Sequence, residues 1–377
     1  MVAEKHGKSY QQVLMELAKT AFGPGKLSFN DYLTFRLFDD AALAGADKAQ
    51  FVGLDAARRI WLTANFDQDW WGVMQNKLAA TTLLGGYGYP VIPTLALVSD
   101  CLDMRSAPLL RDAAALANFL RDPTHYPLFG KPMDSLRSLG SASFDRYDAA
   151  TDVLVTPHGA HVAVEAFAAE VVQNYHAGYI LQRRVSPHAA IRAVAGDRLA
   201  TVRVLTIRDS QGARVHRAVW KIPAGSNVAD NFWRGNLLAT LDLENGRVVR
   251  AVRGTGLNQE IVERDPDSGA ALVGFEIPCW DEVKALACAG AGMLGGIRLI
   301  GWDIAVTDAG AVIVEPNYTP DFDMLQMADR RGMLDQPFLA FLDECKAAAR
   351  AAKRRLQQIR AEETRSRMRQ LSQSLGF

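Results

Sequence analysis

The chain has 377 residues, with 42 basic and 42 acidic side chains and therefore no formal net charge. Its hydrophobic fraction of 49% and charged fraction of 22% are ordinary for a globular protein and exclude a disordered chain. The neutral balance gives no reason to expect a nucleic-acid-binding protein. The charge is uneven, because residues 340–377 hold nine basic and four acidic side chains, which leaves the rest of the chain at −5.

The first residues of the chain are polar and lack the apolar core of a signal peptide. Its four cysteines have neither the spacing of a disulfide framework nor that of a zinc site. No uninterrupted apolar run approaches the roughly 18 residues of a membrane-spanning helix, so no span is expected. Together these features favour a cytoplasmic protein with reduced thiols.

Residues 1–75 are expected to be mostly helical, because Gln11–Ala21 and Asp40–Ala49 have apolar residues at helical spacing. Lys77–Gly85 is typical of a helix that ends at a glycine pair, and Val91–Val98 is typical of a strand.

In the middle of the chain, Tyr126–Pro132 predicts a short apolar strand that ends in a lysine. The small polar residues of Asp134–Ser143 predict a loop. Val162–Gln173 has helical periodicity, and Gly178–Val185 is rich in β-forming residues.

From residue 201 onward, alternating and β-branched segments predict a strand-rich region with one helix over Asp281–Ala291. The predicted strands are Thr201–Arg208, Val215–Ile222, Leu237–Leu243, Arg247–Val252, Leu299–Thr307 and Ala311–Glu315.

The tail is predicted to be one long helix, because apolar residues recur at alternating steps of four and three from Phe338 to Ile359. This apolar seam is compatible with docking on the helix's own domain, with a homodimer contact, or with a charged partner or membrane surface.

Asp303 and Glu315 are carboxylates within two neighbouring apolar strands, and a hairpin would bring them together. Glu315 and Asn317 share a strand face because they lie two residues apart. Two carboxylates and an amide oxygen on one face form a hard-oxygen site of the kind that Mg²⁺ on a phosphate chain requires. The alternative is structural, with Asp303 and Asn317 bonded to turns.

Several cations also lie within or at the ends of predicted strands. Lys131 precedes a loop with backbone donors suited to phosphate, although a lone lysine there is often only a solvated charge. Arg203 and Lys221 lie mid-strand among apolar neighbours, where a cation needs an anionic partner. The strand end at Gln182 and Arg183 is suited to pairing with an adenine edge, and the alternative is an edge strand whose basic side chains lie in water.

In this order, the motifs resemble the ATP-grasp superfamily, more narrowly its sugar-transfer associated group, and more distantly the alpha-L-glutamate ligases. The motifs that carry the resemblance are FGKP (129–132), LQRRV (181–185), TVRVLT (201–206), DNFWRGN (230–236), GWDIAVT (301–307) and VEPN (314–317).

The resemblance implies an α+β protein in which two α+β lobes clamp ATP between them. It further implies phosphate contacts from Lys131 and Lys77 and a phosphate lid around Gly140 and Ser141. Adenine contacts are implied for Gln182, Arg183 and Val185, and a ribose contact for His188. Asp303, Glu315 and Asn317 are implied to bind Mg²⁺, and Arg203 and Lys221 to have catalytic roles. The expected parts are a helical region (1–75), an N-terminal lobe with the lid (76–185), a C-terminal lobe with the Mg²⁺ site (186–335) and a basic C-terminal helix (336–377).

The function implied by the resemblance is an ADP-forming ligase. It would join a small-molecule carboxylate to an amine through an acyl phosphate, with ATP and Mg²⁺ as cofactors. A phosphotransferase on the same scaffold, and a nucleotide-binding scaffold protein in glycan or secondary-metabolite assembly, remain open alternatives.

Overall fold

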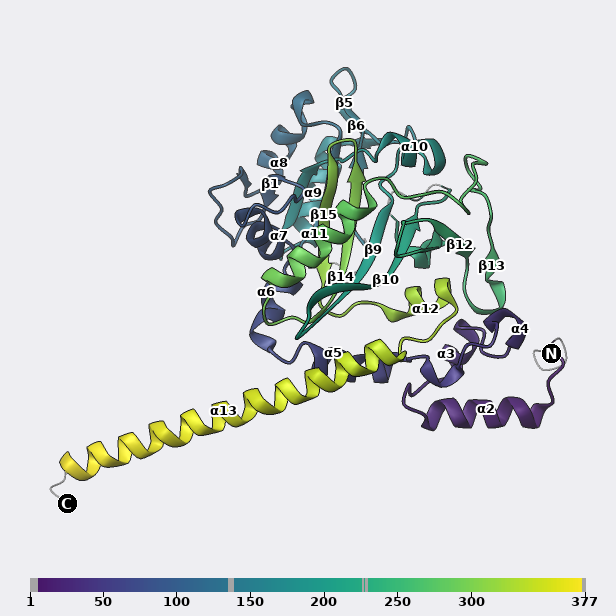
Figure 1. Cartoon of the computed structure of the whole chain (residues 1–377). Helices are drawn as coiled ribbons and strands as arrows, with labels where there is room; N and C mark the ends of the chain where they lie inside the picture. Colours follow the sequence, from purple (N-terminus) through teal and green to yellow (C-terminus); the bar gives the residue numbers. More distant parts are fainter. Residues whose placement is uncertain (1–5, 135–138, 226, 228–229, 375–377) are drawn as a thin grey trace.

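The computed structural model describes residues 6–134, 139–225, 227 and 230–374. A seven-stranded sheet is its largest element, with the strand order β13-β12-β11-β10-β9-β14-β15 and antiparallel neighbours throughout (Figure 1). Its strands are β9 (Thr201–Asp209), β10 (Gly212–Ile222), β11 (Leu237–Leu241), β12 (Val248–Arg253), β13 (Glu260–Ile261), β14 (Leu299–Thr307) and β15 (Gly310–Asn317).

A second sheet has five strands in the order β2-β1-β8-β3-β4, and a small sheet has the order β5-β6-β7. The strands of the five-stranded sheet are β1 (Thr94–Val98), β2 (Leu109–Leu110), β3 (Leu128–Pro132), β4 (Ala142–Phe144) and β8 (Tyr179–Arg183). The small sheet consists of β5 (Arg146–Asp148), β6 (Val153–Val155) and β7 (His161–Ala163). Helices α8 (Ala113–Leu120) and α9 (Val164–Asn174) share one hydrophobic core with the five-stranded sheet.

One face of the seven-stranded sheet packs against helix α11 (Trp280–Met293). Strand residues of alternating position, such as Val202, Trp220 and Trp302, join the apolar side of α11 in a single core. Trp302 is fully buried, and its indole N–H donates to the Thr206 hydroxyl over 2.9 Å. This face is therefore a packed apolar core.

The opposite face of the same sheet is covered by the N-terminal region together with α12 (Phe322–Asp329) and the start of α13 (Gln336–Ser374). Phe38, Phe322 and Phe338 join Leu205 and Val219 of the sheet in one core. The N-terminal helices on this face are α2 (Tyr10–Phe22), α3 (Phe29–Thr34), α4 (Asp40–Leu43) and α5 (Leu54–Ala64). The next two helices, α6 (Trp71–Gln75) and α7 (Lys77–Gly86), contribute Met74 and Leu84 to the core on the α11 side. Residues near the start of the chain thus complete the core of a sheet formed much later in the sequence.

Two local predictions need correction. The predicted helix over Asp40–Ala49 is wrong beyond Leu43, because Ala44 and Gly45 adopt left-handed backbone with φ of +48° and +84°. A separate 3₁₀ turn follows at Lys48–Gln50. The predicted loop over residues 134–143 lies in part outside the described residues, at positions 135–138, and its end forms strand β4 against β3.

The tail forms one long helix, as predicted, and its first turns dock on the protein's own core. Phe338, Phe341, Leu342 and Cys345 are buried there. Beyond Lys346 the helix soon becomes exposed and projects from the rest of the molecule (Figure 1). A homodimer contact along this part stays a prediction. Among the described helices, none has both the length and the apolar composition needed to cross a bilayer.

The contact between α11 and Trp302 gives a direct test of the sheet's packing. A Cβ at Gly290 would lie 2.7 Å from Trp302 Cη2, whereas one at Gly292 on the same helix would meet nothing within 4 Å. We expect Gly290→Ala to lower the free energy of unfolding by about 1–3 kcal/mol through overpacking. Gly292→Ala should leave it unchanged or raise it by up to about 1 kcal/mol. Urea unfolding of both variants checks this, and equal effects would contradict the packing.

Candidate functional site

A cavity of about 750 Å³ is lined by side chains from both larger sheets. The predicted site residues that line it are Lys77, Lys131, Ser141, Gln182, Arg183, Val185, Arg203, Lys221, Asp303, Glu315 and Asn317. Gly140 and His188 are the predicted residues outside this lining. The structure thus brings residues from distant parts of the sequence to one place.

A row of charged residues crosses four adjacent strands on the face away from α11. Arg203 on β9 lies directly opposite Asp303 on β14, which in turn lies opposite Glu315 on β15. Arg203 donates two hydrogen bonds to the Asp303 carboxylate, from Nε at 2.6 Å and from Nη2 at 3.0 Å. Lys221 on β10 approaches the same carboxylate to 3.1 Å. Because neighbours on antiparallel strands share a face, strand register alone assembles this row.

The charges of this row hold one another in the ionised state. Burial opposes ionisation of Asp303, but the charges of Arg203 and Lys221 outweigh it and place the pKa of Asp303 far below its usual range. Burial alone would lower the pKa of Lys221, but the charges of Asp230 and Asp303 raise it above its usual value. Asp303 and Lys221 therefore stay ionised at neutral pH.

Lys131 has a different environment from the other cations. Its side chain is buried, and no hydrogen bond or ion pair holds its ammonium within the described part of the chain. Burial lowers the pKa of Lys131, and the nearby charge of Lys77 lowers it further, while Glu315 and Asp303 oppose the shift. Lys77 itself donates to the Met133 carbonyl at 3.4 Å. Lys131 is thus a cation at the cavity wall that an anionic ligand would satisfy.

At the end of β8, the Gln182 and Arg183 side chains are bonded within the protein. Gln182 is buried and donates to the Ile92 carbonyl at 3.0 Å. Arg183 donates to the carbonyls of Tyr126 and Thr124, each at 3.0 Å. These bonds fix the strand end where Val185 also reaches the cavity. A base bound here would meet main-chain groups and Val185 rather than these two polar groups.

The predicted lid and ribose residues are placed differently from one another. Ser141 lines the cavity, whereas Gly140 has φ +75° and a carbonyl that accepts from the Tyr179 hydroxyl at 3.0 Å. His188 lies outside the cavity lining and caps helix α10 (Ala189–Ala195), where its Nδ1 accepts from the Ala190 N–H at 3.1 Å. The structure therefore gives His188 a capping role, and its ribose contact stays a prediction.

The oxygen atoms at the end of β15 fit a magnesium ion that is shared with a phosphate chain. Glu315 and Asn317 lie two residues apart on this strand, and the Asn317 amide nitrogen donates to the Gly301 carbonyl at 3.3 Å, which leaves its oxygen as the ligand atom. Asp303 is already bonded to two cations. No three His, Cys, Asp or Glu side chains within the described ranges could hold a metal alone. Nucleotide-bound Mg²⁺ needs only one or two protein carboxylates, because phosphate and water oxygens complete its shell.

Sequence patterns predicted no role for two residues of the cavity lining, Asp230 and Tyr318. Asp230 pairs with Lys221 at 3.2 Å and accepts from the Thr201 N–H at 2.9 Å. Tyr318 packs its ring on Trp71 at a centroid distance of 5.2 Å. The signal for Asp230 was the buried position of Lys221, which requires a counter-charge. Tyr318 had no comparable signal beyond its position next to Asn317.

Residues 164–339 match the family described as sugar-transfer associated ATP-grasp. This segment, a little under half of the chain, is similar to that family. The match contains Gln182, Arg203, Asp303 and Glu315, so the predicted resemblance is confirmed over the residues of the charged row. The predicted α+β ATP-grasp fold is likewise confirmed. A comparison with curated proteins found no match.

Several solved structures resemble this chain at low identity. The D-alanine–D-alanine ligase from Coxiella burnetii is 13% identical over 78% of this chain and 62% of that one, with a TM-score of 0.44. The ADP complex of purK, an N5-carboxyaminoimidazole ribonucleotide synthetase, is 14% identical over 79% and 59%, with a TM-score of 0.40. The ATP-grasp ligase PsnB, complexed with its precursor peptide PsnA2 and AMPPNP, is 17% identical over 84% and 69%, with a TM-score of 0.35. The chain spans less than two thirds of the length of the first two.

The unpaired state of Lys131 predicts opposite effects of one substitution on stability and on binding. Lys131→Met removes a buried cation without a partner, so the ligand-free protein should be at least as stable as the wild type in urea unfolding. Loss of a charged hydrogen bond to phosphate should weaken ADP binding by about 1.5–3 kcal/mol, or roughly 10- to 100-fold, in calorimetric titration.

Lys284→Met is the matched control, because Lys284 lies outside the cavity lining and donates to the carbonyls of Leu243 and Glu244. It should lose some stability and bind ADP normally. Wild-type ADP affinity in Lys131→Met would contradict the assignment.

Proposed function

We propose that the protein is an ATP- and Mg²⁺-dependent carboxylate–amine ligase that forms ADP and proceeds through an acyl phosphate. The observation that supports this most is the unpaired Lys131 in the same cavity as Glu315 and Asn317. A cation without a partner, together with carboxylate and amide oxygens, matches the needs of a metal-bound polyphosphate.

The nucleotide would lie with its base at the end of β8 and its phosphates toward Lys131. Val185 would contact the base, and Lys77 would assist Lys131 at the phosphates. Glu315 and Asn317 would hold Mg²⁺, whose chemistry is to neutralise the charge that develops on the phosphoryl oxygens. Asp303 would contribute mainly by fixing the cations beside it.

Arg203 would act at the transferring group. Its Nε and Nη2 are bonded to Asp303, whereas its Nη1 has no partner within the described residues and the side chain lines the cavity. A guanidinium fixed in this way can donate to an oxygen of the phosphoryl group without reorganising. Lys221, held between Asp230 and Asp303, adds a positive charge at a fixed position.

The proposed reaction needs no covalent enzyme intermediate. The substrate carboxylate oxygen attacks the γ-phosphorus of ATP, the bond to the β-phosphate oxygen breaks, and ADP leaves. The amine nitrogen then attacks the acyl carbon, inorganic phosphate leaves, and the amine loses a proton. The protein would contribute positioning and charge.

The experiment is incubation of the full chain with ATP, Mg²⁺ and pooled carboxylates, with amines or hydroxylamine as acceptors. We expect ADP release and new masses that correspond to amides and, with hydroxylamine, to hydroxamates. Glu315→Gln should lower ADP release by about 100-fold or more, because one charged Mg²⁺ ligand is lost. ADP release and product mass are the measurements.

Asp308→Asn is the control for this substitution, because Asp308 lies at the turn between β14 and β15 and outside the cavity lining. It should retain wild-type ADP release. A phosphoester product without hydroxamate would show that the protein is a phosphotransferase and not a ligase. Absence of ATP-dependent product with every acceptor would contradict both.

A further inference from the structure

A second group of cations lies where the N-terminal region meets the seven-stranded sheet and α12. Arg36 follows α3, Arg250 is on β12, and Arg330 ends α12. None of the three lines the cavity described above. Each is partly buried rather than fully exposed. They come from segments that are far apart in the sequence.

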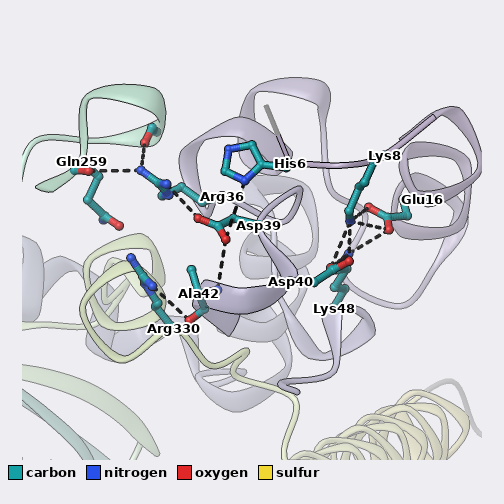
Figure 2. Close-up of polar contacts among 11 residues, drawn as sticks. His6, Lys8, Glu16, Arg36, Asp39, Asp40, Ala42, Lys48, Gln259 and Arg330 are labelled. Atoms are coloured by element: carbon teal, nitrogen blue, oxygen red, sulfur yellow. Dashed lines mark hydrogen bonds and ion pairs between the residues drawn. The ribbon is translucent and has the colours of Figure 1, made fainter. Parts of the chain in front are cut away.

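A chain of contacts links these three arginines, which we call the ring, and the charges of Arg36 and Arg330 both act on Arg250. Arg36 donates to Asp39 at 2.8 Å, and the Asp39 carboxylate accepts the Ala42 N–H at 3.0 Å. The Ala42 carbonyl in turn accepts from Arg330 at 3.0 Å (Figure 2). Arg330 follows Ala328 by two residues, and the Ala328 carbonyl accepts from Arg250 at 3.0 Å.

Among the residues that the structure describes, the ring leaves several buried donors without an acceptor. Arg250 has two such nitrogens, Nε and Nη2, while Arg36 and Arg330 each have an unbonded Nε. Gln259, whose carbonyl accepts from Arg36 at 3.1 Å, has a buried and unbonded side-chain amide nitrogen (Figure 2). Buried donors are normally bonded, so this local concentration indicates a missing acceptor.

The charges around the ring are also unbalanced. Asp39 pairs with Arg36, and it lies 3.8 Å from His6. Asp329 also acts on Arg250, but it is bonded to Arg217 and Arg331 outside the ring. Burial lowers the pKa of Arg250 to about 10, with further lowering by the charges of Arg330 and Arg36. An anion in the ring would supply both the acceptor and the counter-charge.

We propose that Arg36, Arg250 and Arg330 form a binding site for a small oxyanion of the phosphate type, separate from the catalytic cavity. Guanidinium groups are suited to such an ion, because their planar N–H forks bind oxyanions with two parallel hydrogen bonds. The Gln259 amide is a further donor. The proposal does not depend on the ligase assignment.

The bound anion would stabilise the N-terminal region on the sheet. Helix α12 connects this anion site with the cavity. The last residues of α12 contact the ring through Ala328 and Arg330. Met324 on the same helix lines the cavity, as does Asp321 immediately before it. The helix is only eight residues long, so it links the ring directly to the cavity wall.

The test is thermal unfolding of the full chain in inorganic phosphate against chloride at matched ionic strength. Four proteins are compared with the wild type. Lys131→Met removes the cavity's unpaired cation, Arg250→Met and Arg330→Gly each remove one cation of the ring, and Arg253→Met is a control on the same strand as Arg250. Glycine is chosen at position 330 because Arg330 has φ +52°, so this variant should fold even if Arg250→Met does not.

We expect phosphate to raise the melting temperature of the wild type, Lys131→Met and Arg253→Met with the same half-saturating concentration. That concentration should rise by tenfold or more in Arg250→Met and Arg330→Gly. If phosphate acts no differently from chloride, the site does not exist. If its effect disappears in Lys131→Met and persists in Arg330→Gly, phosphate binds in the catalytic cavity and the proposal fails.

Discussion

The bidentate ion pair between Arg203 and Asp303 joins two neighbouring strands and removes both charges from water. Such a pair is maintained against a large desolvation cost, and loss of one partner typically destabilises a protein by about 3–5 kcal/mol. It also fixes strand register, because a slip of one residue would turn Arg203 toward the apolar core around α11. The position of Glu315, opposite Asp303 on the next strand, depends on the same register.

Apart from the charged row, the sheet face that bears it is covered by apolar residues. On that face, Leu205 and Val219 pack against α12, the base of α13 and the N-terminal helices. The row itself opens to the cavity at one end of the sheet. The N-terminal region therefore supports the site without supplying its charged row, and α12 contributes to both the core and the cavity wall.

Much of this arrangement could be predicted because it depends on local patterns. The alternation of apolar and polar residues identified the strands. A hairpin between two apolar strands implied that Asp303 and Glu315 would lie close together. Non-local features could not be predicted in this way. The partner of Arg203 is 100 positions away, and the sequence of Asp40–Ala49 favours a helix that left-handed backbone at Ala44 interrupts. The capping bond between His188 and Ala190 is a further feature that the motif position of His188 did not reveal, and its ribose contact stays a prediction.

The balance of charge in the cavity explains why a metal ion belongs in the proposed chemistry. Arg203 and Lys221 are matched by Asp303 and Asp230, so this part of the row is neutral before any ligand binds. Lys131 and Lys77 remain, and Glu315 partly offsets the charge of Lys131. A bare triphosphate carries several negative charges, and these groups alone would leave most of them uncompensated in a partly dry cavity. A divalent cation held by Glu315 and Asn317 would remove that excess, which makes metal-loaded nucleotide, rather than free nucleotide, the species that the cavity is suited to bind.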